Sequence, residues 1–99
     1  MPDVDLLAAL AAWCREQAPS LQAGGVELKC GGTEGDRPKH ARWVNLHGHE
    51  HVAELIVWET GEAEFVARGT RDVDEHHEIA GIDQLNELLA RLVAVVQPA

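Results

Sequence analysis

The chain has 99 residues, 45% of them hydrophobic, and its 17 acidic and 8 basic side chains give a formal charge of −9. This length predicts one domain over residues 1–99. The core should be thin, because a small chain buries a modest share of its surface, and a deep, enclosed active site is therefore not expected. The negative field disfavours nucleic acid and anionic membranes as partners, and it favours a basic partner or plain solubility.

The first predicted element is a helix from Asp3 to Gln17. Its apolar residues recur at helical spacing and form one stripe, namely Leu6, Leu7, Leu10, Trp13 and Cys14. Asp3 is placed to cap this helix, and Asp5 suits its positive N-terminal end. We expect Ala18-Pro19 to end the helix, since the residue before a proline is pushed out of the α region.

The middle of the chain predicts a series of short strands separated by turns. Apolar and alternating patterns predict strands over 26–30, 41–46, 62–68 and 73–79. Glycine-rich or polar segments over 31–39, 47–50, 60–61 and 69–72 predict the connections. A further strand over 51–59 is apolar at every position from Leu55 to Trp58, which is typical of a central strand covered on both faces.

The last predicted element is a helix from Ile82 to Val96, with Asp83 as its cap and leucines at helical spacing. Short connections favour antiparallel hairpins, and the pattern contains no β-α-β crossover. The predicted class is therefore α+β in the order α-β-β-β-β-β-α, an antiparallel sheet of four to five strands with the N- and C-terminal helices packed on it. Both helices on one face, or one helix on each face, would satisfy this pattern.

The two cysteines, Cys14 and Cys30, lie on predicted apolar faces, and we interpret both as core residues. The first residues carry Asp3 and Asp5 where a secretory signal has basic residues, and no apolar run approaches the roughly 18 residues that span a membrane. These features predict reduced thiols, a cytoplasmic location and no membrane contact.

Histidines supply a spacing that suits metal ligands. His47, His49 and His51 alternate around a predicted turn, and Glu54 follows shortly after them. Alternate residues of a strand point the same way, as a metal site requires. The spacing matches most of the first metal motif of cupin barrels, but the second motif is missing and the C-terminal helix does not belong to that fold. A small metal-binding or cupin-like protein is thus an alternative to the main hypothesis, which needs no metal and no cofactor.

Charge is the positive functional signal, because no carboxylate pair, activated cysteine or phosphate-binding loop stands out. From Glu50 to Glu78 the chain has nine acidic residues and two basic ones, Arg68 and Arg71. Like charges on neighbouring strands repel each other, so such clusters often serve fast, steered binding to a basic surface. We therefore expect a binding protein and no enzyme, with a general acidic interaction module or a merely soluble surface as alternatives.

Several segments resemble, in order, the small bacterial immunity proteins of the TriTu kind, and the resemblance covers most of the chain. These segments are the first helix with Trp13, the strand at Gly25–Leu28, Val57–Gly61 with its Trp-Glu-Thr-Gly turn, Glu75–Ile79 and Leu85–Leu89.

The resemblance implies a non-enzymatic immunity protein of a polymorphic toxin system. Such a protein binds and occludes a cognate secreted ADP-ribosyltransferase toxin, which otherwise modifies elongation factor Tu in the producing cell. A transferase that binds the pyrophosphate of NAD needs a basic cleft, and an acidic face suits such a cleft. Charge and resemblance together predict the partner-binding residues Trp58, Glu59, Glu62, Glu64, Asp72, Asp74 and Glu75.

Overall fold

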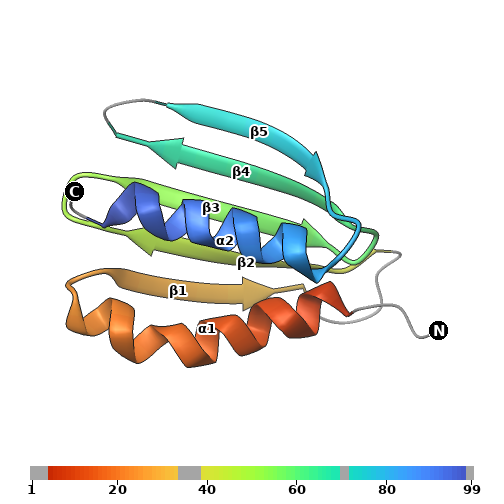
Figure 1. Cartoon of the computed structure of the whole chain (residues 1–99), viewed down its shortest axis with the longest axis horizontal. Helices are drawn as coiled ribbons and strands as arrows, with labels where there is room; N and C mark the ends of the chain where they lie inside the picture. The colour runs from red at the N-terminus through yellow and green to blue at the C-terminus, as the bar shows by residue number, and fades with distance from the viewer. Residues whose placement is uncertain (1–4, 34–38, 70–71, 98–99) are drawn as a thin grey trace.

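The computed structural model describes residues 5–33, 39–69 and 72–97. These residues form two helices and one antiparallel sheet of five strands, whose spatial order β1-β2-β3-β4-β5 follows the chain (Figure 1). The predicted α+β class and the order of its elements are confirmed. The elements are α1 (Leu6–Ala23), β1 (Glu27–Gly32), β2 (Ala41–His47), β3 (Val52–Trp58), β4 (Glu62–Arg68), β5 (Val73–Glu78) and α2 (Ile82–Val96).

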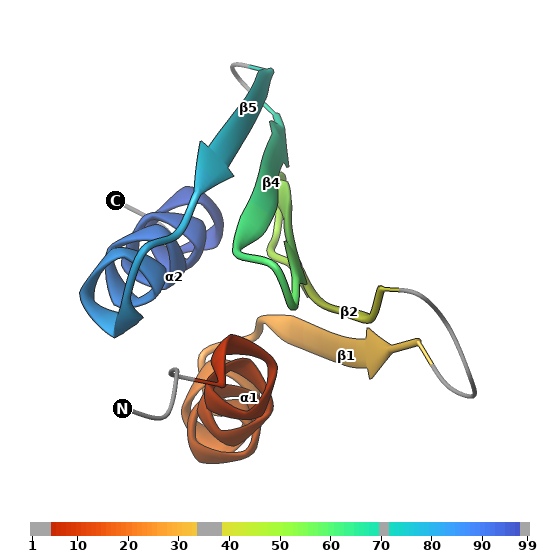
Figure 2. The same ribbon diagram turned by 90° about the vertical axis from the view of Figure 1, so that its right-hand side faces the viewer.

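Both helices pack on the same face of the sheet, and no helix of the described residues lies on the opposite face (Figure 2). α2 lies mainly against β3, whereas α1 lies against β1 and β2. Of the two arrangements compatible with the sequence pattern, the structure therefore has the one with both helices on one side. Of the helices in the described residues, none is long and apolar enough to cross a membrane.

The core lies between the two helices and the covered face of the sheet. Alternation along β3 turns Ala53, Leu55 and Val57 towards the helices, and the register places Val44 and Phe65 on either side of Leu55. α2 contributes one apolar side, made of Leu85, Leu88, Leu89, Leu92 and Val96. No polar or charged residue is buried in the described part of the chain, so hydrophobic burial is the main force that holds these layers together.

The helix α1 begins and ends later than predicted. Its N-cap is Asp5, whose carboxylate accepts a hydrogen bond of 3.0 Å from the backbone N–H of Ala8. The predicted cap, Asp3, lies outside the described residues. The predicted stop at Ala18-Pro19 is wrong, because the helix continues through Pro19 to Ala23. The additional turn buries Leu21, which contributes about 2–3 kcal/mol and offsets most of the ~3 kcal/mol that a proline inside a helix costs.

A Schellman motif ends α1 after Ala23. Gly25 has a φ of 87°, and its N–H donates to the carbonyl of Gln22 at 3.1 Å, while the N–H of Val26 donates to the carbonyl of Leu21 at 2.9 Å. Val26 and Leu21 are both buried, as the apolar contact that accompanies this motif requires. The sequence signal for the helix end is therefore the glycine pair followed by an apolar residue, and not the proline.

The helix α2 has the predicted bounds, Ile82–Val96, but not the predicted cap. Its N-cap is Gly81, which makes no side-chain cap hydrogen bond, and Asp83 lies within the first turn. The prediction of Asp83 as the cap is therefore wrong by two positions. A carboxylate in the first turn still interacts favourably with the positive end of the helix.

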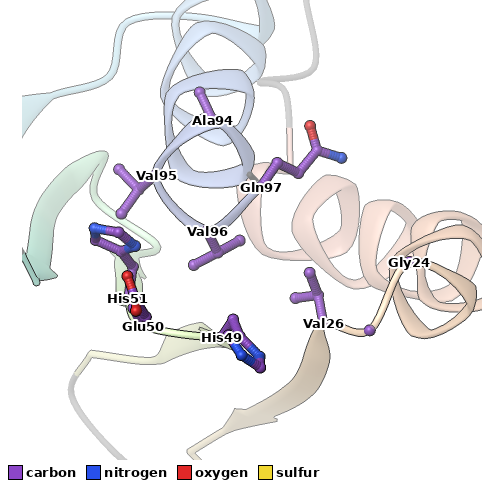
Figure 3. Close-up of a pocket in the computed structure, with 10 residues that line it drawn as sticks. Gly24, Val26, His49, Glu50, His51, Ala94, Val95, Val96 and Gln97 are labelled. Carbon is purple, nitrogen blue, oxygen red and sulfur yellow. The ribbon is translucent and has the colours of Figure 1, made fainter. Parts of the chain in front are cut away.

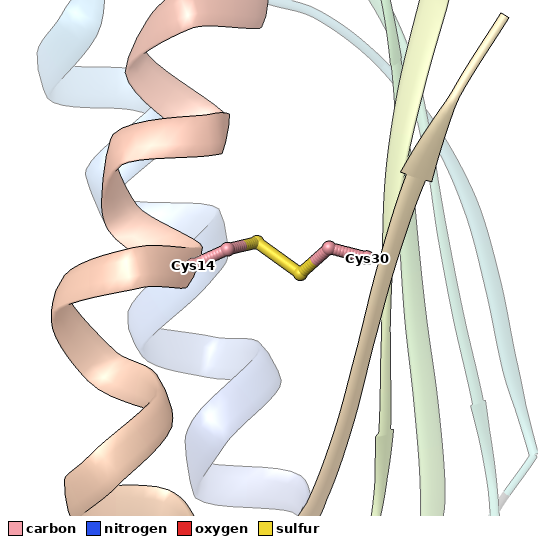
Figure 4. The surroundings of a disulfide bond; sticks show 2 residues. All are labelled: Cys14 and Cys30. Atoms are coloured by element: carbon pink, nitrogen blue, oxygen red, sulfur yellow. A yellow bond between two sulfur atoms is a disulfide. The ribbon is translucent and has the colours of Figure 1, made fainter.

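A disulfide joins Cys14 of α1 to Cys30 of β1, whose Cα atoms are 6.8 Å apart (Figure 4). The prediction of reduced thiols is therefore wrong for this structure. Cys14 is a buried core residue as predicted, but Cys30 is exposed. Val44, the cross-strand neighbour of Cys30, is buried beneath the helices. Since paired residues point to the same side of a sheet, Cys30 also points to the helix side. The bond depends on the packing of α1 against β1, a tertiary contact that residue spacing along the chain does not define.

Candidate functional site

The apolar run in β3 builds both the core and an uncovered surface. Leu55 and Val57 are buried beneath the helices, whereas Ile56 and Trp58 are half-buried on the opposite side of the sheet. The prediction of a central strand is right, since β3 is the third of the five strands. The prediction that this strand is covered on both faces is wrong within the described residues, because both helices lie on one side (Figure 2).

The side of the sheet that points away from the helices is here named the open face. Strand alternation and register place on it Glu27, Lys29, Gly31, Ala41, Trp43, Asn45, His47, Val52, Glu54, Ile56, Trp58, Glu62, Glu64, Val66, Arg68, Asp74, His76 and Glu78. All of these residues except Ala41 are half-buried or exposed, so they are accessible to a partner.

Four apolar side chains, Trp43, Ile56, Trp58 and Val66, form an apolar patch in the middle of the open face. Trp43 and Ile56 are directly opposite each other on β2 and β3. Trp58 is the next residue of β3 on the same face, and Val66 on β4 is a diagonal neighbour of Ile56. The predicted site contains one member of this patch, Trp58. Two further members, Trp43 and Ile56, could have been identified from the sequence, because strand alternation places Ile56 on the same face as Trp58 and Trp43 lies in the neighbouring strand.

Carboxylates of β4 and β5 border the apolar patch. Glu62 pairs with Glu78 across the two strands, Glu64 pairs with His76, and Asp74 lies opposite Val66. Like charges directly opposite each other destabilise a sheet, so this border is not explained by the stability of the fold. Its acidic character suits a partner that brings positive charge.

One cation from the chain itself contacts this border. Lys39 Nζ lies 2.7 Å from Glu62 Oε2 and 5.5 Å from the centre of the Trp58 ring. The hydrogen bond and the charge of Lys39 lower the pKa of the Glu62 carboxyl below its usual range. Sequence reasoning did not single out Lys39, because its partners are 19 and 23 positions away in the chain.

The predicted residues Glu59 and Asp72 lie near opposite ends of the sheet. Glu59 follows β3, and its carboxylate accepts a hydrogen bond of 3.1 Å from the N–H of His40, whose carbonyl accepts one of 2.9 Å from the N–H of Glu59. Asp72 precedes β5 and is exposed. Glu59 also lines a hollow with Leu6 and Leu7 of α1, so it follows Trp58 in the chain without belonging to the side of the sheet that holds Trp58. Asp72 precedes Asp74 by two positions.

The predicted residue Glu75 lies on the helix side of the sheet, away from Trp58, Glu62, Glu64 and Asp74. Its carboxylate accepts two hydrogen bonds of 3.0 Å from Arg91 of α2 and lies 2.7 Å from His77 Nε2. Arg91, and then His77, lower the pKa of Glu75 to about 2. Arg91 also lies 4.7 Å from the centre of the Phe65 ring. This group joins α2 to β4 and β5, so the structure does not bring Glu75 together with the open face.

The histidines of the metal alternative are divided between two places. His47 and Glu54 belong to β2 and β3, whereas His49 and His51 line a hollow of about 740 Å³ beside the C-terminal end of α2 (Figure 3). Within residues 5–33, 39–69 and 72–97, no group of three or more His, Cys, Asp or Glu side chains could hold a metal ion. The sheet also has two edges, β1 and β5, so the cupin-like barrel is wrong.

Comparison with known proteins identifies one family. The model of the family described as Immunity protein TriTu matches residues 8–95, from within α1 to the last turn of α2. No curated protein and no solved structure matches the chain. Because the match covers nearly all of both helices and every strand of the sheet, the chain belongs to the TriTu immunity protein family.

Proposed function

We propose that this protein is a non-enzymatic antidote that binds an ADP-ribosyltransferase toxin through the open face and blocks its NAD-binding cleft in the cytoplasm of the producing cell. The observation that carries the proposal is the apolar patch, which lies on a sheet surface without helical cover and is bordered by carboxylates. Apolar surface with a polar rim is typical of protein-binding sites. Membership of an immunity family supports a toxin as the partner.

The charge of the open face suits the cleft of such an enzyme. On β3, β4 and β5 this face has five carboxylates, those of Glu54, Glu62, Glu64, Asp74 and Glu78, against one basic side chain, that of Arg68. A transferase must attract the diphosphate of NAD, so its cleft is positively charged, and an acidic surface is steered towards it. Covering the cleft would stop the modification of elongation factor Tu without any reaction by the antidote itself.

The open face supplies a large part of the area that a partner needs. Five strands spaced about 4.8 Å apart and roughly 20 Å long present on the order of 500 Å² of projected surface. A standard interface buries about 800 Å² on each partner, so the open face accounts for more than half of one side.

Charge reversal on two faces tests where the toxin binds. The double variant Glu64→Lys, Asp74→Lys changes the open face, and Asp83→Lys, Glu87→Lys makes the same charge change at exposed positions of α2. We expect the first pair to weaken binding of the transferase domain at least tenfold, mainly through a slower association at low salt, and to abolish protection in a co-expression growth assay. Equal effects of the two pairs would remove the open face from the proposal.

The dose dependence of protection tests the non-enzymatic mechanism. A blocking antidote reduces transferase activity in proportion to its amount and abolishes it at about one equivalent. It also leaves elongation factor Tu that was modified beforehand unchanged. Protection at far less than one equivalent, or removal of ADP-ribose from the modified factor, would show that the protein acts as an enzyme.

A further inference from the structure

The turn between β3 and β4 holds an indole and a carboxylate around one cation. Trp58 ends β3 and Glu62 begins β4, and the connecting turn is closed by a hydrogen bond of 2.9 Å from the Gly61 N–H to the Trp58 carbonyl. Lys39 Nζ lies 2.7 Å from Glu62 Oε2 and 5.5 Å from the Trp58 ring centre. An aromatic face together with a carboxylate is a combination that proteins use to bind a cationic group.

The lysine that occupies this place is easily displaced. The side chains of Lys39 and Glu62 retain 36% and 43% of their exposure, so water screens the ion pair and it contributes little to folding. Neighbouring backbone is held separately, through the bonds between His40 and Glu59. The Lys39 side chain can therefore move away while the Trp58–Glu62 pair and the strands around it stay in place.

Elsewhere in this protein, an arginine binds a ring and a carboxylate at the same time. On the helix side of the sheet, Arg91 donates two hydrogen bonds of 3.0 Å to the Glu75 carboxylate while its guanidinium lies 4.7 Å from the Phe65 ring centre. A planar guanidinium can stack on a ring and bind a carboxylate in two places at once, whereas an ammonium group interacts as a point charge. Tryptophan is a better cation acceptor than phenylalanine.

From this comparison, we propose that Trp58 and Glu62 form a subsite for an arginine side chain of the toxin, and that Lys39 is a placeholder that this arginine displaces. The inference rests on the proposed function and adds the chemistry of one contact to it. The subsite adjoins the apolar patch through Trp58, so a partner that covers the patch also excludes water from the subsite. Exclusion of water strengthens both the cation–π contact and the ion pair.

Substitution of Lys39 tests whether Trp58 and Glu62 bind an arginine of the toxin. Lys39→Met keeps an unbranched apolar stem but removes the charge that competes with the arginine. We expect Lys39→Met to bind the purified transferase domain about three- to fivefold more tightly than the wild-type protein, and Glu62→Gln to bind it about tenfold more weakly. In the double variant, the gain from Lys39→Met should disappear, because the carboxylate that the arginine needs is absent.

A matched control separates this effect from the general gain of one negative charge. Lys29→Met makes the same change at an exposed lysine of β1 on the same face, where Lys29 pairs with Glu27 at 3.3 Å. Lys39→Met should increase the affinity more than Lys29→Met does. Equal gains, or weaker binding by Lys39→Met, would overturn the subsite, and weaker binding would mean that Lys39 itself contacts the toxin.

The toxin side supplies a second, independent readout. Among single Arg→Ala variants of the transferase domain, one should bind wild-type antidote and the Glu62→Gln variant equally well. If no toxin arginine removes that difference, the subsite is wrong although the antidote still binds. If the wild-type protein neither binds the transferase domain nor protects against it, the proposed function fails instead. Circular dichroism and thermal unfolding verify that each antidote variant is folded.

Discussion

The indole of Trp43 on β2 leans over Gly31, its cross-strand neighbour on β1. A Cβ atom at position 31 would stand 2.7 Å from the indole Nε1, closer than real Cβ contacts come. The absence of a side chain at Gly31 therefore sets the position of an indole that forms one end of the apolar patch.

Gly31→Ala is expected to displace this indole and weaken toxin binding roughly tenfold, because tryptophan is enriched among the few interface residues that carry most of the binding energy. The tryptophan emission spectrum and the Kd for the transferase domain measure the two effects. Gly24→Ala is the control, since a Cβ there meets nothing closer than 3.6 Å. An unchanged spectrum and Kd for Gly31→Ala would show that the indole tolerates a methyl group.

Two neighbouring residues of β3 should separate stability from binding. Leu55 is fully buried beneath the helices, and Leu55→Ala is expected to lower the free energy of unfolding by about 2–5 kcal/mol. Ile56 is half-buried on the open face, and Ile56→Ala is expected to lower it by only about 1 kcal/mol while weakening toxin binding.

Urea unfolding and a binding titration on the same samples give both quantities for each variant. The idea that the two faces of β3 have different roles is contradicted if Ile56→Ala binds the toxin as well as the wild-type protein does.

The disulfide between Cys14 and Cys30 should stabilise the fold measurably. It closes a loop with a sequence separation of 16, for which the loss of chain entropy in the unfolded state predicts about 3 kcal/mol. For a domain of this size, such a loss corresponds to a decrease in Tm of roughly 10–20 °C. Thermal unfolding with and without a thiol reductant measures the decrease.

Cys30→Ser serves as the control for that experiment, because Cys30 is exposed and its replacement leaves no cavity. The variant should unfold at the Tm of the reduced wild-type protein and should not respond to reductant. Identical Tm values for oxidised and reduced wild-type protein would mean that the bond does not constrain the unfolded chain.

Acid should weaken the attachment of α2 to the sheet through Glu75. Arg91 and then His77 lower the pKa of this carboxyl from 4.5 to about 2 in the folded protein. A lowered folded-state pKa stabilises the protein above the unfolded-state value, and this contribution is lost as the pH falls from about 4.5 to about 2. Glu75→Gln should therefore be less stable than the wild-type protein near pH 6, with a difference that shrinks towards pH 2.

Urea unfolding at several pH values between 2 and 6 checks this dependence. Glu87→Gln, at an exposed position of α2, is the matched control and should parallel the wild-type protein. A Glu75→Gln difference that stays constant across the whole pH range would exclude a charge-dependent contact.

Elements with a strong periodic pattern have the bounds that the sequence predicts. β4 spans Glu62–Arg68 and α2 spans Ile82–Val96, because alternation in the strand and leucine spacing in the helix both end where the burial ends. α1 differs because burial of Leu21 and the Gly24-Gly25 turn together override the local preference of the residue before Pro19. The tendency of Ala18-Pro19 to end a helix is thus outweighed by tertiary packing.

The candidate site was harder to predict, because a strand pattern separates two faces without showing which one the helices cover. Asp74 and Glu75 are adjacent in β5 and therefore point to opposite sides of the sheet, so they cannot both belong to one flat interface. The ion pair of Glu75 with Arg91 assigns Glu75 to the helix side. The disulfide and the contact of Lys39 with Trp58 likewise depend on contacts between distant segments.

The strand order β1-β2-β3-β4-β5 has a kinetic consequence. Every strand pairs with its neighbour in the chain, so each step of sheet formation closes a short loop and loses little chain entropy. Sheets built from local pairings assemble faster than those that join distant segments. We therefore expect the sheet of a newly synthesised copy to form without a slow step of long-range strand pairing.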